Sequence, residues 1–208
     1  MSDELSLDRG RTAVLVIECQ NDLIHESHLG EKGVSGGLAR AVAERGVLGR
    51  IAEVLSAARA AGIPVLYANK ETKPGIPPGR APIHRLARNR PILLEGSWGA
   101  QVHEAIAPQE GDLVLRRFLG IDPSADSELF GTLGLLRRDT VIVMGVSTNF
   151  AVEGTVRGAV NLGLSVLVPE DCCASVPWEM HRFSVERILP LLATVTSSSK
   201  IVAALARA

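Results

Sequence analysis

Short apolar runs alternate along this chain with longer segments whose apolar residues recur at helical spacing. Residues 12–17 are apolar at every position from Ala13 onward, as a strand covered on both faces must be. The segment 46–61 follows, with Val47, Ile51, Leu55 and Ala58 on one face of a predicted helix. Gly62 stands where that helix is expected to end.

The same alternation continues to the C-terminus, and it predicts an α/β fold. Six parallel strands joined by crossover helices indicate a Rossmann-like three-layer sandwich, formed by residues 1–208 as a single domain. The segment 70–98 breaks the rhythm with five prolines. We interpret it as a long surface loop, with a lid or a subunit contact as the alternative. The other strands are expected at 63–68, 112–117, 140–146, 164–169 and 194–197, and the other helices at 99–106, 127–138, 149–163, 177–191 and after 197.

Composition and charge exclude several classes of protein. Of the 208 residues, 46% are apolar, which excludes a disordered chain. No apolar run approaches the ~18 residues of a membrane span, and the polar, acidic start lacks the features of a signal peptide. A net charge of −1 indicates neither nucleic acid nor an anionic membrane as a partner. Three cysteines, an odd number, favour reduced thiols and a cytoplasmic protein.

The carboxyl ends of the strands are where a fold of this class binds its ligands. Glu18 directly follows the first apolar run, and Arg116 and Arg117 end the third expected strand. Alternation places these two arginines on opposite faces of the sheet. We therefore expect one arginine to face the ligand crevice and the other to be a solvated end charge.

The fourth strand leads into a helix whose start can hold negative charge. Thr148 or Asn149 is a suitable N-cap. Ala151 then falls in the first helical turn, where backbone N–H groups and the helix dipole favour an anion.

Four stretches carry a resemblance to a known family: TAVLVIECQNDLI, GDLVLRRF, SELFGT and VIVMGVSTNFAVEGTVRGAVNLGLSVLVPEDCCAS. Over roughly residues 11–200 the chain resembles the isochorismatase-like, or cysteine hydrolase, superfamily. The resemblance implies an Asp–Lys–Cys triad whose thiolate attacks an amide or similar carbonyl, releasing ammonia and an acid. It also implies a cis peptide between Val146 and Ser147, and a homo-oligomer of at least two chains.

The sequence departs from that triad at all three positions, with Glu18 for the Asp, Arg117 for the Lys and Ala151 for the Cys. A laboratory change would account for Ala151 only. Loss of catalysis and a change of chemistry would each account for all three. A methyl group cannot form a thioester, and an arginine stays protonated at any working pH, although it can hold a carboxylate by a bidentate contact.

The isochorismatase branch, which this chain resembles in lacking the thiol, cleaves a vinyl ether with the strand-one acid. The sequence therefore favours acid-assisted hydrolysis or lyase-type chemistry on a small carboxylated metabolite, by Glu18 and Arg117. A nearby arginine, however, lowers the pKa of a carboxyl group and makes it a poorer acid. The alternative is a catalytically silent protein that binds a ligand or a partner. An open crevice favours the enzyme, and a crevice filled by a Glu18–Arg117 pair favours the silent protein.

Further residues are assigned more briefly. Cys19, Cys172 and Cys173 are interpreted as packing residues, and His25 and His28 as surface residues near the crevice, either of which could act as acid or base. No metal is expected, because residues 69–71 lack the Asp and His cluster by which some nicotinamidase-like relatives bind one. No cofactor is expected either, because neither a Walker nor a GxGxxG motif is present. The residues expected to line the substrate site are Gln20, Trp98, Phe118, Ser147, Asn149 and Phe150.

Overall fold

A parallel sheet forms the centre of the molecule in a computed structural model that describes residues 5–77, 79–84, 92–125 and 128–208. In the described part of the chain the sheet has seven strands; six follow the order β3-β2-β1-β4-β5-β7, and β6 pairs with β4 off this path. The expected α/β fold is confirmed. The strands are β1 Thr12–Ile17, β2 Val65–Lys70, β3 Leu113–Arg117, β4 Thr140–Val146, β5 Ser165–Pro169, β6 Cys173–Ala174 and β7 Thr194–Thr196.

Two details of the sheet differ from the expectation. The strand expected at 63–68 begins only at Val65, because the Ile63 N–H bonds to the Ala58 carbonyl across the turn that ends the preceding helix. It then runs on to Lys70, paired with Arg117 of β3. The two-residue β6 was not expected. It is too short to show a periodicity, and it is defined only by its pairing with residues 145 and 146 of β4.

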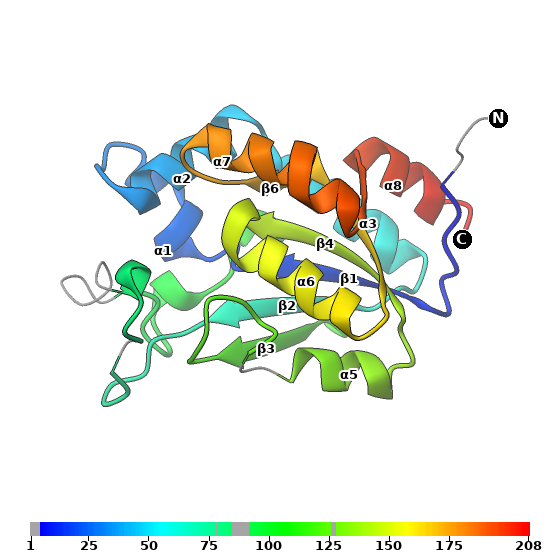
Figure 1. Ribbon diagram of the computed structural model, residues 1–208, viewed down its shortest axis with the longest axis horizontal. Coiled ribbons are helices and arrows are strands. Elements are labelled where there is room, and N and C mark those ends of the chain that lie inside the picture. The colour runs from blue at the N-terminus through cyan, green and yellow to red at the C-terminus, as the bar shows by residue number, and fades with distance from the viewer. Residues whose placement is uncertain (1–4, 78, 85–91, 126–127) are drawn as a thin grey trace.

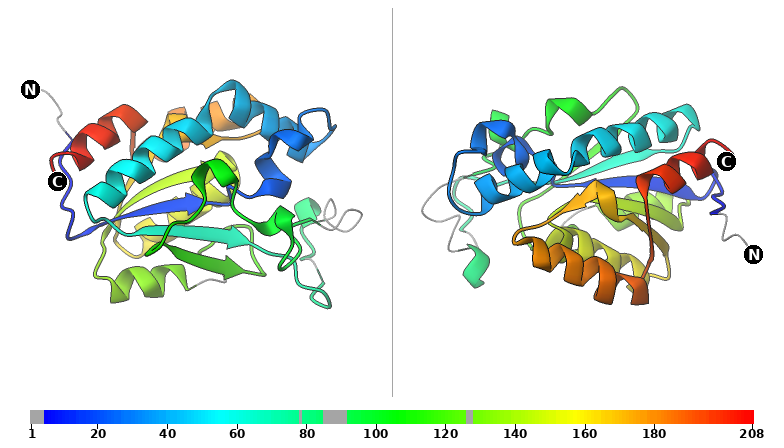
Figure 2. Two further views of the ribbon diagram at one scale, coloured as in Figure 1. Left: turned by 180° about the vertical axis from the view of Figure 1, so that it is seen from behind. Right: turned by 90° about the horizontal axis from the view of Figure 1, so that it is seen from above.

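Helices cover both faces of the sheet (Figure 1). The three layers are seen edge-on in the right-hand view of Figure 2, where α2, α3 and α8 lie on one side of the sheet and α6 and α7 on the other. Among the described residues, none of the helices is long and apolar enough to cross a membrane. The helices are α1 Asn21–Ile24, α2 Val34–Glu44, α3 Val47–Ala60, α5 Leu129–Leu135, α6 Glu153–Asn161, α7 Trp178–Phe183 and α8 Ser198–Leu205.

Helix α2 was not expected, because Gly36 and Gly37 lower the helix propensity of its first turns. Gly36 is required there, since a Cβ atom would lie 2.1 Å from the Glu31 carbonyl oxygen. The helix expected at 149–163 begins with a π-helical turn, and the helix expected at 177–191 passes from α7 into a π-helical turn and then a 3-10 turn. The helix expected at 99–106 consists of two short 3-10 turns. The irregular turns are η1 Glu26–His28, η2 Trp98–Ala100, η3 Glu104–Ile106, η4 Thr148–Val152, η5 Glu170–Cys172, η6 Ser184–Ile188 and η7 Leu189–Leu191.

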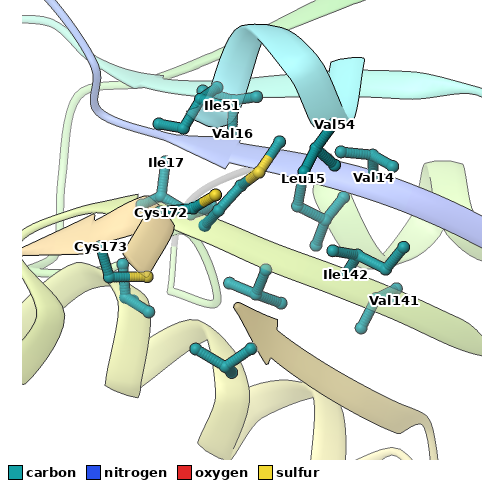
Figure 3. Close-up of a cluster of buried hydrophobic side chains, with 14 of the residues drawn as sticks. Val14, Leu15, Val16, Ile17, Ile51, Val54, Val141, Ile142, Cys172 and Cys173 are labelled. Carbon is teal, nitrogen blue, oxygen red and sulfur yellow. The ribbon is translucent and has the colours of Figure 1, made fainter. Parts of the chain in front are cut away.

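The apolar core lies on both faces of β1, whose six residues are all buried. Figure 3 shows part of this core, where Ile51 and Val54 of α3 lie near the β1 side chains and Cys172 and Cys173 lie by the β4 end. Burial of each large aliphatic side chain contributes about 1.5–3 kcal/mol. The core therefore fixes β1 and β4 side by side, and with them the residues that follow each strand.

The end of β4 approaches β1 very closely. A Cβ atom on Gly145, which has φ 124°, would lie 2.2 Å from the Ile17 carbonyl oxygen, so only glycine fits. The next peptide, Val146–Ser147, is cis, as the resemblance implies, and Val176–Pro177 is also cis. The turn that follows β4 is thereby held against the end of β1.

Candidate active site

Glu18 and Arg117 meet directly at the carboxyl edge of the sheet. Glu18 follows β1 in the left-handed region, at φ 51°, and its side chain is 13% exposed. Arg117 is the last residue of β3, and its side chain is 1% exposed. Its Nη2 donates hydrogen bonds to Glu18 Oε1 and to the Ile121 carbonyl. The two residues form a buried ion pair that spans the width of β2.

The two neighbouring arginines differ as alternation along the strand predicts. The side chain of Arg116 is 62% exposed and pairs with Glu71, with 3.2 Å between Arg116 Nε and Glu71 Oε1. Arg117 faces the opposite way and is buried. Its Nε and Nη1 are also buried and have no hydrogen-bond partner in the described part of the chain. An unpaired buried donor costs about 1–3 kcal/mol. An anion that accepted hydrogen bonds from these atoms would remove that cost.

Burial raises the pKa of Glu18, and Arg117 opposes this shift as the largest lowering influence. The net direction is upward, so the pKa-lowering effect of Arg117 is smaller than the pKa-raising effect of desolvation. Two further charges act on Glu18: Lys70, which lowers its pKa, and Asp122, which raises it. The sequence analysis missed both residues. Lys70 stands directly beside Arg117 in the β2–β3 register, a position visible only once the strands are paired.

Ala151 lies in the turn η4 that follows β4, the strand adjacent to β1. It is 1% exposed, and its carbonyl accepts a hydrogen bond of 2.7 Å from Thr155 Oγ1. The turn is further fixed by Thr148, whose Oγ1 lies 2.8 Å from Nδ1 of the buried His181. The three positions that the resemblance aligns with a triad therefore lie at the carboxyl ends of strands in the β3-β2-β1-β4 part of the sheet.

The side chains expected to bind substrate occupy different environments. The Gln20 amide is fully buried; it donates to the carbonyls of Lys70 and Ala100, at 2.8 and 2.7 Å, and accepts from the Lys70 N–H at 2.9 Å. Its contacts tie the ends of β1 and β2 together. Trp98 and Phe150 are 49% and 43% exposed and so are open to a ligand.

The other three expected contacts have protein partners. Asn149 Oδ1 accepts a hydrogen bond from Ser175 Oγ. The Ser147 carbonyl accepts from two amides of the η4 turn. The Phe118 carbonyl accepts from Lys70 Nζ, and its ring lies 5.0 Å from Lys73 Nζ.

The cysteines and histidines only partly follow expectation. Cys19, Cys172 and Cys173 are buried packing residues, as expected. The interpretation of His28 as a surface residue is wrong: it is 7% exposed, and its Nδ1 lies 3.0 Å from Glu31 Oε1. The reason is that α2, which the sequence analysis did not anticipate, packs against the η1 turn that contains His28.

Two cavities lie away from these residues. One of about 370 Å³ lies between α3 and residues 104–109, and one of about 750 Å³ lies beside residues 43–53, Asp171 and the start of α8. Neither cavity is lined by Glu18, Arg117 or Ala151.

Comparison with known proteins agrees with this architecture. The isochorismatase domain model matches residues 12–200. An uncharacterized isochorismatase family protein of Escherichia coli, YecD, is 35% identical over 117 residues, which cover 55% of this chain and 59% of that protein. The ureidoacrylate amidohydrolase RutB of Methylobacterium radiotolerans is 28% identical, over 89% of this chain and 76% of its own. The crystal structure of a cysteine hydrolase from Pseudomonas syringae pv. phaseolicola is similar with a TM-score of 0.78 and 25% identity, over 99% of this chain and 98% of that one.

Proposed function

The chain belongs to the isochorismatase family, and we propose that it binds a small carboxylated metabolite at Arg117 and cleaves it with Glu18 as the acid, without a cysteine nucleophile. Ala151 offers no thiol, so the covalent thioester route is closed at this position. The substrate is held by charge and the reaction is assisted by a proton.

The observation that carries the proposal is that, among the described residues, only one of the three guanidinium nitrogens of Arg117 has a hydrogen-bond partner. Its Nη2 is engaged by Glu18 and Ile121, while the buried Nε and Nη1 have no partner in the described residues. A carboxylate can bind an arginine across Nε and Nη2 or across Nη1 and Nη2. An anion that shares Nη2 with Glu18 would therefore engage one of the two unpaired nitrogens. RutB supports this substrate class, since its name describes action on an acrylate. A carboxylate bound in this way would satisfy a donor that is otherwise desolvated without compensation.

Binding at Arg117 would also prepare Glu18 for proton transfer. A substrate anion on Arg117 offsets the positive charge that now lowers the pKa of Glu18, so the pKa rises further. A protonated Glu18 can then donate its proton to the leaving oxygen or nitrogen of the substrate as the bond breaks. In a hydrolysis, water supplies the oxygen for the other product, and its remaining proton restores Glu18. The order of events is carboxylate binding first and proton donation second.

A second candidate is favoured by a different observation. Glu18 and Arg117 already pair with each other, and the two cavities described above lie elsewhere. Such a closed pair is the arrangement expected of a catalytically silent family member that binds a ligand or a partner.

The test is a thermal-shift screen of small carboxylated metabolites, followed by mass spectrometry of the products formed from each hit. We expect a hit to bind the native protein at least about tenfold more tightly than Arg117→Lys, since lysine cannot form the bidentate contact. The matched control is Arg116→Lys, which changes the exposed neighbour and should bind like the native protein. Glu18→Gln should bind the hit and form no product.

The outcomes separate the two candidates. Product formed by the native protein and not by Glu18→Gln supports the acid mechanism. Binding that depends on Arg117 with no product in any variant supports the silent protein. Binding equally strong in Arg117→Lys contradicts the acid mechanism, and without product it is the result expected of a silent protein that binds its ligand elsewhere.

A further inference from the structure

Two histidine–glutamate pairs meet where the segment that follows β1 contacts the segment that precedes β3. His25 and Glu26 begin the turn η1, and His103 and Glu104 begin the turn η3. One ligand atom from each of the four side chains lies within 4.8 Å of the others. The two pairs are far apart in sequence and are brought together because the His103 N–H bonds to the Cys19 carbonyl and residues 20 and 102 form a β-bridge.

Each histidine lies close to the glutamate of the other pair. His103 Nε2 lies 2.9 Å from Glu26 Oε2, and His25 Nε2 lies 3.5 Å from Glu104 Oε1 and 3.9 Å from Glu26 Oε2. Within the described residues, the ion pairs of both glutamates are with these two histidines. In the part of the chain that the structure describes, two carboxylates therefore converge with no lysine or arginine paired to them.

We propose that His25, Glu26, His103 and Glu104 form a binding site for one divalent transition-metal ion, of which Zn²⁺ fits best. Imidazole nitrogens and carboxylate oxygens are its usual non-sulfur ligands. At metal–ligand distances near 2.0–2.1 Å, a tetrahedral site places its ligand atoms about 3.4 Å apart. The separations of 2.9, 3.5 and 3.9 Å given above differ from that value by at most about half an ångström, and the widest separation among the four ligand atoms is 4.8 Å. Side-chain adjustments alone can thus complete the site.

The two imidazole rings are held in orientation by their other nitrogens. His25 Nδ1 accepts from the Ser27 N–H at 3.1 Å and lies 2.9 Å from Ser27 Oγ, and His103 Nδ1 accepts from the Ala105 N–H at 3.2 Å. Metal binding through Nε2 moves the ring proton to Nδ1. The Nδ1–H of His25 can then donate to Ser27 Oγ, while the N–H groups of Ser27 and Ala105 both lose their acceptors. The metal–ligand bonds have to offset the loss of these two hydrogen bonds.

The two carboxylates are accessible to an ion, since the Glu26 side chain is 59% exposed and that of Glu104 66%. Trp98 packs edge-on against His25, with 4.8 Å between ring centroids. A bound ion would clamp the segment that carries Trp98 to the segment that follows β1.

This site departs from the expectation of no metal, which rested on residues 69–71 and did not consider pairs so far apart in sequence. It is independent of the function proposed for Glu18 and Arg117, because none of its four residues belongs to that pair.

The test is calorimetric titration of the chelator-treated full chain with ZnCl₂. We expect one ion bound per chain, and a rise in Tm when the ion is present, since a ligand that binds only the folded state stabilises it. Glu26→Gln with Glu104→Gln should weaken binding at least about tenfold. Both side chains are more than half exposed, so this variant should fold like the native protein. His25→Ala should also lose affinity, and the matched control His84→Ala, outside the cluster, should not.

Binding should strengthen from pH 6 to pH 8, because the proton competes with the metal for both imidazoles. Absence of zinc binding at about 100 μM ion, some hundredfold above a micromolar dissociation constant, would overturn the proposal. Binding that persists unchanged in both the double glutamine variant and His25→Ala would overturn it as well.

Discussion

Replacing Arg117 by methionine should strongly destabilise the protein, because it would leave the Glu18 carboxyl buried without its cation. The Arg117 side chain is 1% exposed and that of Glu18 13%, so water can replace little of the lost interaction. Removal of one partner from a buried ion pair typically costs about 3–5 kcal/mol. For a chain of this size each kcal/mol lowers the Tm by about 2–4 °C. The expected loss is therefore about 6–20 °C.

The pH dependence of this loss has a defined sign. Burial already raises the pKa of Glu18, and Arg117 is the largest influence that lowers it. Without Arg117 the pKa in the folded state rises further above its value in the unfolded chain. A group with a raised pKa contributes stability below the unfolded pKa and loses that contribution as the pH rises through the folded pKa. Arg117→Met should therefore be more destabilising at pH 8 than at pH 5.

The assay is urea and thermal unfolding, followed by circular dichroism at both pH values. The double variant Glu18→Leu with Arg117→Met removes both charges and should recover to within about 1–2 kcal/mol of the native protein. Arg182→Met, which removes an exposed helix pair with Glu186, should cost less than about 1 kcal/mol. If the double variant is as unstable as Arg117→Met, or the loss is equal at both pH values, the reasoning about the pair is wrong.

Three further predictions concern reactivity and assembly. The Ala151→Cys variant alone should release no ammonia from amides, because the longer Glu18 displaces the carboxylate by about 1.5 Å and Arg117 cannot exchange a proton. Activity should appear only when Glu18→Asp and Arg117→Lys are added to Ala151→Cys. An active single variant would contradict this. Iodoacetamide should leave any turnover unchanged, because the three cysteines are buried and burial raises the pKa of Cys173 to about 12; activity lost together with a mapped alkylated cysteine would point to a relocated nucleophile. Light scattering at micromolar concentration should give the mass of a dimer or larger, and a monomer would contradict the expected assembly.

The order of the elements was predictable because each buried strand carries its own signature. The run 140–146 is almost wholly apolar, and β4 occupies those residues. The opposite orientations of Arg116 and Arg117 followed from the two-residue period of a strand. These features depend only on residues that are neighbours in the sequence, so the local pattern is enough to predict them.

The missed features depend on contacts between distant segments. Lys70 stands beside Arg117 only because β2 extends two residues past its expected end and pairs in register with β3. The histidine–glutamate cluster requires residues 20 and 102 to bridge. Nothing in the local pattern of either segment specifies the other. A histidine followed by a glutamate does not predict a metal site until a second such pair is known to lie against it.

The meeting of Glu18 and Arg117 shows why their substitutions belong together. The strands that carry them are separated by β2, hence by about 9.6 Å at 4.8 Å per strand spacing. The left-handed backbone of Glu18, at φ 51°, departs from the extended path of β1, and two long side chains then bridge the remaining gap. An aspartate is one methylene shorter, and a lysine ends in a single nitrogen. Glu18 pairs with Nη2, and among the described residues two further buried donors of the guanidinium have no partner, whereas a lysine has only one nitrogen. On the function proposed above, positions 18 and 117 together would bind an anion where Ala151 offers no thiol for covalent chemistry.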